Sequence, residues 1–272
     1  MVVPAMAVDG STKIMGVIGD PIAQVMTPTT INAIFAARKV NIVCVPLHIS
    51  AHELETAWKG LKALGNLIGF GITLPHKQAA MTLCDSLEPL AERVGAVNLV
   101  RREADGTFRG YQFDGKGFVR GLKGQGHTPS GSRCLMVGAG GAAIAIAFAL
   151  AEEGAASLTI ANRTRAKAEE LAEAVNRKMG RSFARAGEPR PEPGQIVINA
   201  TSLGLSASDP LPFDTSLIDG TMLIAEVIAK PEVTPLLEAA RARGAQIHSG
   251  IHMIHGQVDL IAAHMAEAQA KV

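Results

Sequence analysis

Residues 133–143 read RCLMVGAGGAA, and this stretch decides the fold of the second half of the chain. An apolar run ends at Gly138, and small residues then lead into a second apolar run that begins at Ile144. Strand, glycine turn and helix in this order are typical of a dinucleotide-binding fingerprint. The first glycine allows a tight turn, the second lets the backbone approach a pyrophosphate, and Ala143 lets the helix pack on the strand. An ordinary glycine-rich turn is the alternative.

The phosphates of the dinucleotide are expected at the start of the helix, where unpaired N–H groups and the positive end of the helix dipole attract anions. The residues expected to contact them are Gly138, Ala139, Gly140, Gly141 and Ala142.

Apolar runs and helical patterns alternate on both sides of this turn. After it, strands are expected at 157–161, 183–186, 196–200, 221–227 and 246–249, with helices at 165–179, 235–242 and 251–268. Before it, strands are expected at 13–20, 41–49, 68–74, 96–102 and 108–114, the last two separated by the turn 104–106. Alternating strands and helices indicate βαβ units, so the fold class is α/β. In the first half, a parallel sheet is expected from the strands at 13–20, 41–49 and 68–74, and the same order repeats after the glycine turn.

Two helices of the first half show clear sequence signals. Thr27 is expected to cap a helix that has Pro28 at its first position. The helix at 51–64 is amphipathic, and its spacing turns Leu54, Trp58, Leu61 and Leu64 inward. A domain boundary is expected near Asp114, before the Gly/Ser-rich linker 124–132.

Composition excludes several function classes. The 272 residues carry a net charge of +1, with one Trp and one Tyr, so neither a basic run nor interleaved aromatics indicate nucleic-acid binding. No apolar stretch approaches the roughly 20 residues of a membrane span, and the N-terminus shows no signal-peptide pattern. The three cysteines fit no metal site, and buried reduced thiols predict a cytoplasmic protein.

Cofactor choice depends on the end of the second strand of the fingerprint unit. An NAD site normally has Asp or Glu there, about 20 residues after the glycines, for the ribose 2′-hydroxyl. This chain has Asn162, Arg163, Thr164 and Arg165 instead. The two arginines could hold a 2′-phosphate, or they could be solvated turn residues. The sequence therefore favours NADP slightly and leaves NAD open.

Hydride transfer between a nicotinamide and the carbon of a hydroxyl or carbonyl group also needs a proton carrier beside the reacting oxygen. Lys77 follows a strand expected to be buried, at the carboxyl end where such sheets bind ligands. Asp114 ends a strand at the expected domain junction, where its alternative role is a helix N-cap. A surface lysine at a helix start is the alternative for Lys77.

The chain resembles the shikimate dehydrogenase family along most of its length. The opening motif is GVIGDPIA at 16–23, the lysine motif is GFGITLPHK at 69–77, and GAVN at 95–98 and DGKGF at 114–118 follow. The later motifs are the glycine turn, NRT at 162–164, NATSLG at 199–204, TPLL at 234–237, and Gly250, Met253 and Gln257. The resemblance implies an N-terminal α/β substrate domain (1–113 plus 251–272) and a C-terminal Rossmann dinucleotide-binding domain (114–250), with substrate and nicotinamide in the cleft between them.

The resemblance also implies roles for single residues. Lys77 would be the general acid/base and Asp114 its ionic partner. Val25, Thr27, Thr73, Asn98 and Gln257 correspond to substrate-binding positions. Thr201, Leu203, Val227, Gly250 and Met253 correspond to positions around the ribose and nicotinamide.

Several of these positions depart from the family pattern. Members that bind shikimate usually have Ser-x-Ser where this chain has Val25 and Thr27, and Asn where it has Gly71. Asn-Thr before the aspartate becomes Gln112-Phe113, and a common Tyr becomes Ala229. Since a substrate carboxylate buried with fewer partners costs free energy, we expect weak shikimate binding or a different substrate.

The expected function is therefore an NAD(P)-dependent oxidoreductase acting on shikimate, quinate or a related cyclic hydroxy acid. The alternative is a dinucleotide-binding sensory or regulatory homologue with little turnover. Eight histidines are spaced so that each is expected to be satisfied or solvated, and no metal site is predicted. A homodimer is possible, with neither nucleic acid nor membrane as a partner.

Overall fold

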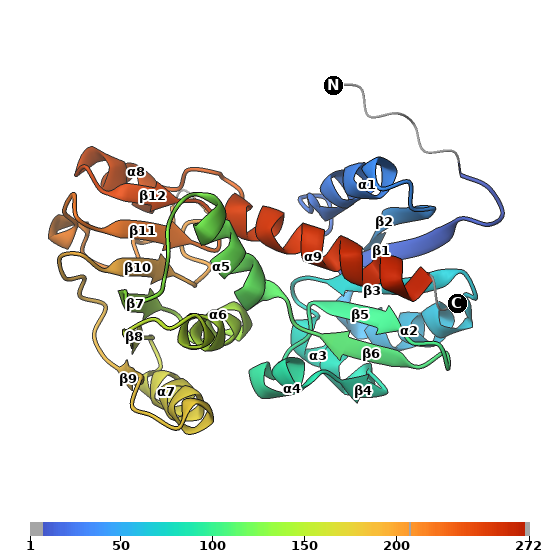
Figure 1. Ribbon diagram of the computed structural model, residues 1–272, viewed down its shortest axis with the longest axis horizontal. Coiled ribbons are helices and arrows are strands. Elements are labelled where there is room, and N and C mark those ends of the chain that lie inside the picture. Colours follow the sequence, from blue (N-terminus) through green and yellow to red (C-terminus); the bar gives the residue numbers. More distant parts are fainter. Residues whose placement is uncertain (1–7, 207, 270–272) are drawn as a thin grey trace. The chain divides into compact units, whose positions relative to one another are not determined.

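The computed structural model describes residues 8–206 and 208–269, and the chain forms two compact units (Figure 1). The first unit comprises Met1–Phe113 and Val258–Val272, and the second comprises Asp114–Gln257. The second division lies within the last helix, α9 (Ile251–Gln269), whereas the sequence suggested a boundary at Gly250. The ligand that each unit binds stays a prediction.

The first unit is built on a mixed six-stranded sheet. Its strands are β1 (Lys13–Gly19), β2 (Ile42–His48), β3 (Leu67–Ile72), β4 (Ser86–Leu87), β5 (Leu99–Arg102) and β6 (Phe108–Tyr111), in the order β2-β1-β3-β5-β6-β4. β1 runs parallel to β2 and β3, whereas β5 is antiparallel to both β3 and β6. The parallel sheet expected from the first three strands is confirmed for β1, β2 and β3, whereas β5 adds an antiparallel strand. A tight turn joins β5 to β6, with Glu103 N donating to Thr107 O at 2.8 Å, and a parallel pair would need a long crossover.

The helices of this unit are α1 (Thr27–Ala37), α2 (Leu54–Ala63), α3 (Lys77–Leu83), α4 (Pro89–Val94) and the end of α9, with a 3₁₀ turn at Ala51–Glu53. Two expectations about them are wrong. Thr27 is the first residue of α1 and makes no capping hydrogen bond, because Met26 occupies the N-cap position. Leu64 follows the end of α2 in an extended conformation, which leaves 44% of it exposed.

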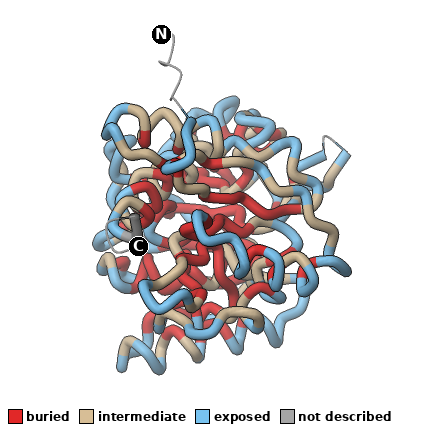
Figure 2. Tube along the Cα trace, turned by 90° about the vertical axis from the view of Figure 1, so that its right-hand side faces the viewer, coloured by how far each residue is buried: buried red, intermediate tan, exposed pale blue. Residues whose placement is uncertain are grey.

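An aromatic cluster joins α2 to the sheet. Trp58 meets Phe70 edge-on, with ring centroids 5.0 Å apart, and Phe108 lies 5.8 Å from Trp58 and 5.3 Å from Phe70. All three side chains are buried, and edge-to-face geometry is favourable for aromatic pairs. Figure 2 shows buried residues following the strands, with exposed residues on the outer helix turns and loops.

The second unit is built on a parallel six-stranded sheet. Its strands are β7 (Arg133–Val137), β8 (Ser157–Ala161), β9 (Ala184–Ala186), β10 (Ile196–Asn199), β11 (Leu223–Glu226) and β12 (Gln246–His248), in the order β12-β11-β10-β7-β8-β9. Its helices are α5 (Asp114–Gly124), α6 (Gly141–Glu152), α7 (Arg165–Met179), α8 (Pro235–Ala242) and the start of α9, with a 3₁₀ turn at Thr215–Leu217. The strand order reverses between β7 and β10, and ligands of such sheets bind at this switch point.

None of the helices in the described parts of the chain is long and apolar enough to cross a membrane. All three cysteines are free thiols, with Cys44 and Cys134 buried and Cys84 half-buried. Burial raises the pKa of each thiol to about 12, so the three side chains stay protonated near neutrality.

Candidate functional site

Backbone hydrogen bonds hold the lysine motif of the first unit at the end of β3. Lys77 is half-buried and begins α3, directly after His76. The buried ring of His76 lies 2.7 Å from the carbonyl oxygen of Ile49, to which its Nε2 can donate. The start of α3 is therefore attached to the segment after β2, and the position of Lys77 is fixed through its neighbour.

Thr73 and Asn98 lie beside the lysine segment. Ile72 N donates to Asn98 O at 2.9 Å, and Val97 N donates to Lys77 O at 3.0 Å. The side-chain oxygen of Asn98 accepts from Phe113 N at 2.8 Å, so Asn98 also fixes the chain that leaves β6. The structure brings Thr73, Lys77 and Asn98 together as polar residues around one loop.

Val25 and Thr27 lie in and after the loop that follows β1. That loop joins the same edge of the sheet, because Asp20 N donates to Leu74 O at 3.0 Å. Both side chains are half-buried, and of the two only Thr27 carries a hydroxyl group. A Cβ on Gly71 would lie 3.7 Å from Val17 Cγ2 and 3.9 Å from Asn98 O, so a methyl group would fit there in ordinary van der Waals contact.

Asp114 and Gln257 belong to the second unit. Asp114 is the first residue of α5 and is only 2% exposed. Gln257 on α9 lies against Gly117, which follows Asp114 at the next turn of α5. These two predicted residues are thus placed near the same helical turn.

The glycine turn has the geometry that the sequence predicts. Gly138 has φ of +122°, and a Cβ there would lie 2.8 Å from Ala200 O, so only glycine fits this turn without strain. Gly140 is the N-cap of α6, and Ala143 is completely buried. The first N–H groups of α6 therefore follow directly after β7, at the switch point of the sheet.

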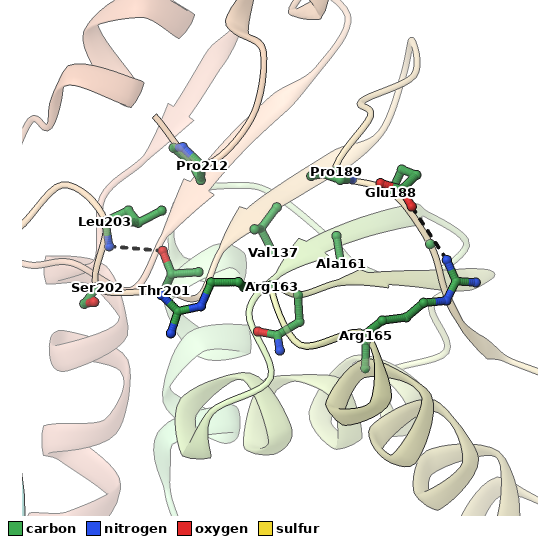
Figure 3. Close-up of a pocket in the computed structure, with 13 residues that line it drawn as sticks. Val137, Ala161, Arg163, Arg165, Glu188, Pro189, Thr201, Ser202, Leu203 and Pro212 are labelled. Atoms are coloured by element: carbon green, nitrogen blue, oxygen red, sulfur yellow. Dashed lines mark hydrogen bonds and ion pairs between the residues drawn. The ribbon is translucent and has the colours of Figure 1, made fainter. Parts of the chain in front are cut away.

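A pocket of about 610 Å³ lies at the carboxyl ends of β7, β8, β9 and β10 (Figure 3). Of the residues predicted for the cofactor, it is lined by Asn162, Arg163, Arg165, Thr201 and Leu203. The remaining predicted cofactor residues do not line it: Gly138, Ala139, Gly140, Gly141, Ala142, Thr164, Val227, Gly250 and Met253. Its volume is within the usual range for a small-molecule site.

The two arginines point to different ends of this pocket. In Figure 3 the side chain of Arg163 extends toward Thr201, whereas Arg165 extends toward Glu188. Arg165 is paired with Glu169, with Nε and Oε1 2.9 Å apart, and its Nη1 lies 3.6 Å from Glu188 Oε1. Of the two, Arg163 has no carboxylate within ion-pair distance among the described residues.

One wall of the pocket is held by a buried polar network. Asn199 Oδ1 accepts from the N–H and the hydroxyl of Thr201, and its Nδ2 donates to Leu203 O and to Glu226 Oε1. Glu226 Oε2 accepts from the Thr234 hydroxyl at 2.6 Å. Burial raises the pKa of Glu226 above its ordinary value, while both hydrogen bonds act in the opposite direction.

Val227, Gly250 and Met253 meet at the ends of β11 and β12. Gly250 packs against the backbone of Val227, and its N–H donates to Ile228 O at 3.0 Å. Met253 N donates to Gly250 O, which places the first turn of α9 over this contact. The three predicted residues thus form one cluster at the carboxyl ends of β11 and β12.

Sequence reasoning missed two carboxylates, Glu188 and Glu226. Glu188 lines the pocket, and no local pattern marks it. Glu226 is completely buried, although a carboxylate at the end of a strand is usually solvated.

His248 contradicts the expectation that each histidine is satisfied or solvated. It is completely buried, and neither ring nitrogen has a hydrogen-bond partner among the residues that the structure describes. Its ring stands edge-on to Phe118 at 5.9 Å, with His252 at 4.9 Å and His127 at 6.3 Å. Desolvation lowers the pKa of His248 to about 3, with smaller contributions from His252 and His127. Within residues 8–206 and 208–269, no group of three or more His, Cys, Asp or Glu side chains could hold a metal ion.

Two family models match the chain. One describes the shikimate dehydrogenase substrate binding domain and matches residues 17–100, and the other describes shikimate / quinate 5-dehydrogenase and matches residues 123–202. A protein of Rubrobacter xylanophilus named shikimate dehydrogenase (NADP(+)) is 42% identical over 241 residues, which cover 87% of this chain and 84% of that protein.

Two solved structures have the same fold along nearly the whole chain. Shikimate 5-dehydrogenase from Listeria monocytogenes, in complex with shikimate and NAD, has a TM-score of 0.83 and 31% identity, and the match covers 98% of this chain and 94% of that one. The 5-ketofructose reductase of Gluconobacter sp. strain CHM43 has a TM-score of 0.80 and 32% identity, with 95% and 98% covered.

Proposed function

Because the chain belongs to the shikimate dehydrogenase family, we propose that it is an NAD(P)-dependent oxidoreductase acting on a CH–OH group. The reaction is reversible hydride transfer between nicotinamide and a ring hydroxyl or ketone of shikimate (3-dehydroshikimate), quinate or a related cyclic hydroxy acid. The observation that carries the proposal is that each unit offers one of the two groups of residues that the reaction needs. A half-buried lysine lies near Thr73 and Asn98 in one unit, and in the other a pocket is lined by Val137, the residue before the glycine turn.

The residues present fit a dinucleotide. The glycine-only turn at Gly138 and the start of α6 suit a pyrophosphate, and the adjoining pocket offers arginines for the adenosine end. When bound, the nicotinamide supplies or accepts the hydride. Val227, Gly250 and Met253 would line its ribose and ring. Asn162, Arg163, Thr164 and Arg165 would surround the adenosine ribose, with a slight preference for NADP over NAD.

Lys77 is the general acid/base of the proposed reaction, and Asp114 is its partner carboxylate. In the reduction, the ammonium group of Lys77 donates a proton to the developing alkoxide, and in the oxidation the amine takes it back. The support for this role is that backbone hydrogen bonds join the segments of Thr73, Lys77 and Asn98, and the polar groups of Thr73 and Asn98 suit substrate hydroxyls. Gln257 would contribute a further hydrogen bond to substrate.

The substrate shell differs from the usual family pattern. Val25 removes one donor for a ring carboxylate, Thr27 keeps one hydroxyl, and Gly71 has no side chain where a polar one is usual. A charged group that loses partners costs more than about 1–3 kcal/mol, so shikimate should bind more weakly than in a biosynthetic enzyme. The 5-ketofructose reductase among the similar structures shows a different named substrate on this fold.

A panel of substrates tests the proposal directly. Purified protein is assayed with shikimate, quinate, related cyclic hydroxy acids and a neutral keto sugar, each with NADP(H) and NAD(H). Turnover of at least one cyclic hydroxy acid is expected, and it should depend on Lys77 and Asp114. Tight dinucleotide binding without turnover of any compound would instead support a sensory or regulatory homologue, which the altered Val25 and Gly71 keep open.

Three further expectations stay with this proposal. The substrate domain is 1–113 plus 251–272, and the NAD(P)-binding domain is 114–250. The protein is cytoplasmic, and it forms a homodimer. Size-exclusion chromatography with light scattering tests the last of these.

A further inference from the structure

Glu188 follows β9, the strand that pairs with the second strand of the fingerprint unit, β8. β8 and β9 run parallel with Leu158 opposite Ala184 and Ile160 opposite Ala186. The ladder continues past β9, since Gly187 N donates to Ile160 O at 2.9 Å. The same register places Glu188 opposite Asn162, the position where an NAD site normally has its acidic residue.

The backbone before Glu188 is adapted to this placement. A Cβ on Gly187 would lie 2.6 Å from Thr159 Cγ2, so glycine allows the chain to pass close over β8. Gly187, Glu188 and Pro189 all line the pocket, opposite the wall formed by Thr201 and Leu203 (Figure 3).

Glu188 also competes for one of the two arginines. Its Oε1 lies 3.6 Å from Arg165 Nη1, and both side chains are largely exposed, at 81% for Glu188 and 67% for Arg165. An ion pair in this setting is weak, so it can open when a ligand offers a better partner. A 2′-phosphate would pair with Arg165 but would be repelled by the Glu188 carboxylate.

We infer that Glu188 is a second specificity determinant of the dinucleotide pocket, which accepts the ribose 2′-hydroxyl of NAD and disfavours the 2′-phosphate of NADP. Arg163 and Arg165 favour the 2′-phosphate of NADP. The pocket therefore has a carboxylate that favours NAD and arginines that favour NADP. This inference rests on the proposed dinucleotide function, and it identifies the residue that keeps the preference for NADP small.

Binding of the two cofactors to unliganded protein tests the inference without any turnover. Kd values for NAD and NADP are measured by calorimetry for the wild type and for Glu188→Gln. The variant should bind NAD about 5-fold more weakly and NADP about 3-fold more tightly, because it loses a charged acceptor and a repulsive charge. The ratio of the two Kd values therefore shifts by about an order of magnitude toward NADP.

Glu169→Gln is the matched control. It removes the same charge from Arg165, but Glu169 does not line the pocket, so the Kd for NAD should stay within about 2-fold of the wild type. An unchanged ratio in Glu188→Gln, or an equal shift in both variants, would overturn the inference. Wild-type protein that binds neither cofactor would overturn the proposed function as well, whereas binding of both without turnover would overturn only the proposed function.

Discussion

The lysine segment and the dinucleotide pocket hold their functional residues in different ways. Around Lys77, the stabilising contacts that join Thr73, Asn98 and the start of α3 are mainly backbone hydrogen bonds. Around the pocket, the wall at Thr201 depends on side chains, because Thr201 donates to Asn199 and Asn199 donates to Glu226. Substitutions in the first region should therefore change chemistry with little change in stability, whereas substitutions in the second should change both.

The largest expected effect is that of Lys77→Ala on turnover. Removing the proton carrier should lower kcat about 10³-fold with the best substrate of the panel. The free energy of unfolding should change by less than about 1 kcal/mol, because the side chain is half-exposed and the carbonyl that accepts from Val97 remains. Steady-state kinetics and urea unfolding measure the two quantities.

Gln78→Ala, at the exposed neighbouring position, is the control for Lys77→Ala and should keep its activity. Unchanged kcat in Lys77→Ala would exclude the proposed mechanism. If Lys77→Ala lost enough stability to account for its lost activity, the lysine segment would behave like the pocket wall. The proposed difference between the two regions would then be wrong.

Glu226→Ala should have the largest effect on stability. It leaves the Thr234 hydroxyl and one N–H of Asn199 without their acceptor and opens a cavity, which together cost about 3 kcal/mol. Dinucleotide binding should weaken with it, since Thr201 loses the support of Asn199. Urea unfolding and calorimetric titration with NADP measure both effects.

Glu226→Gln is the informative partner of that variant. Its carbonyl can accept from Asn199 and its amino group can donate to Thr234, so stability should stay within about 1 kcal/mol of the wild type. Because burial raises the pKa of Glu226, the native state binds more protons than the unfolded state, and wild-type stability falls as pH rises through that raised pKa. Glu226→Gln does not titrate at this position, so its free energy of unfolding should rise relative to that of the wild type as pH increases. Equal stability of the Ala and Gln variants would contradict a hydrogen-bonding role.

His248 is also a buried ionisable group. Unlike Glu226, it has no hydrogen-bond partner for its ring nitrogens among the described residues. Its native pKa of about 3 lies below the unfolded value of about 6.5, so its contribution to stability is complete above pH 6.5 and is lost as pH falls toward 3. Between pH 8 and pH 5 this group alone should cost about 2 kcal/mol. Urea unfolding at the two pH values, for the wild type and His248→Leu, measures the loss.

The leucine variant removes the titration, so its stability should fall less over the same range of pH. His252 has a pKa lowered by burial and by His255, and Glu232 acts against this, so a residual loss at low pH is expected in both proteins. An identical loss in the wild type and His248→Leu would show that His248 is not the responsible group.

The sequence predicts most strongly where the signal is local. The helices α7 and α8 and the strand β8 have the bounds that the pattern predicts, because proline, caps and apolar spacing mark their ends. β4 and α4 have only two and six residues, too few for a periodic signal, and they were missed. The antiparallel pairing of β5 with β6 follows from the short turn between them, which has no room for a crossover helix.

The candidate site divides in the same way. Asn162, Arg163 and Arg165 follow directly from the glycine turn, and the structure places all three on the pocket. Glu188 reaches that pocket only through the pairing of β8 with β9, and Glu226 only through hydrogen bonds to Asn199 and Thr234. Neither strand pairing nor a buried acceptor can be read from neighbouring residues, so both required the structure.

The smallest expected effect concerns the choice between the two cofactors. Arg163→Ala should weaken NADP about 5-fold and leave NAD within about 2-fold, because the exposed guanidinium group would contact only the 2′-phosphate. Arg165→Ala should have a weaker effect, since Arg165 already lies near Glu169 and Glu188. Arg190→Ala removes a nearby exposed charge that does not line the pocket and should change neither Kd. Equal weakening of NAD and NADP by Arg163→Ala would mean that this arginine supports the shape of the pocket, like Asn199, and does not recognise the phosphate.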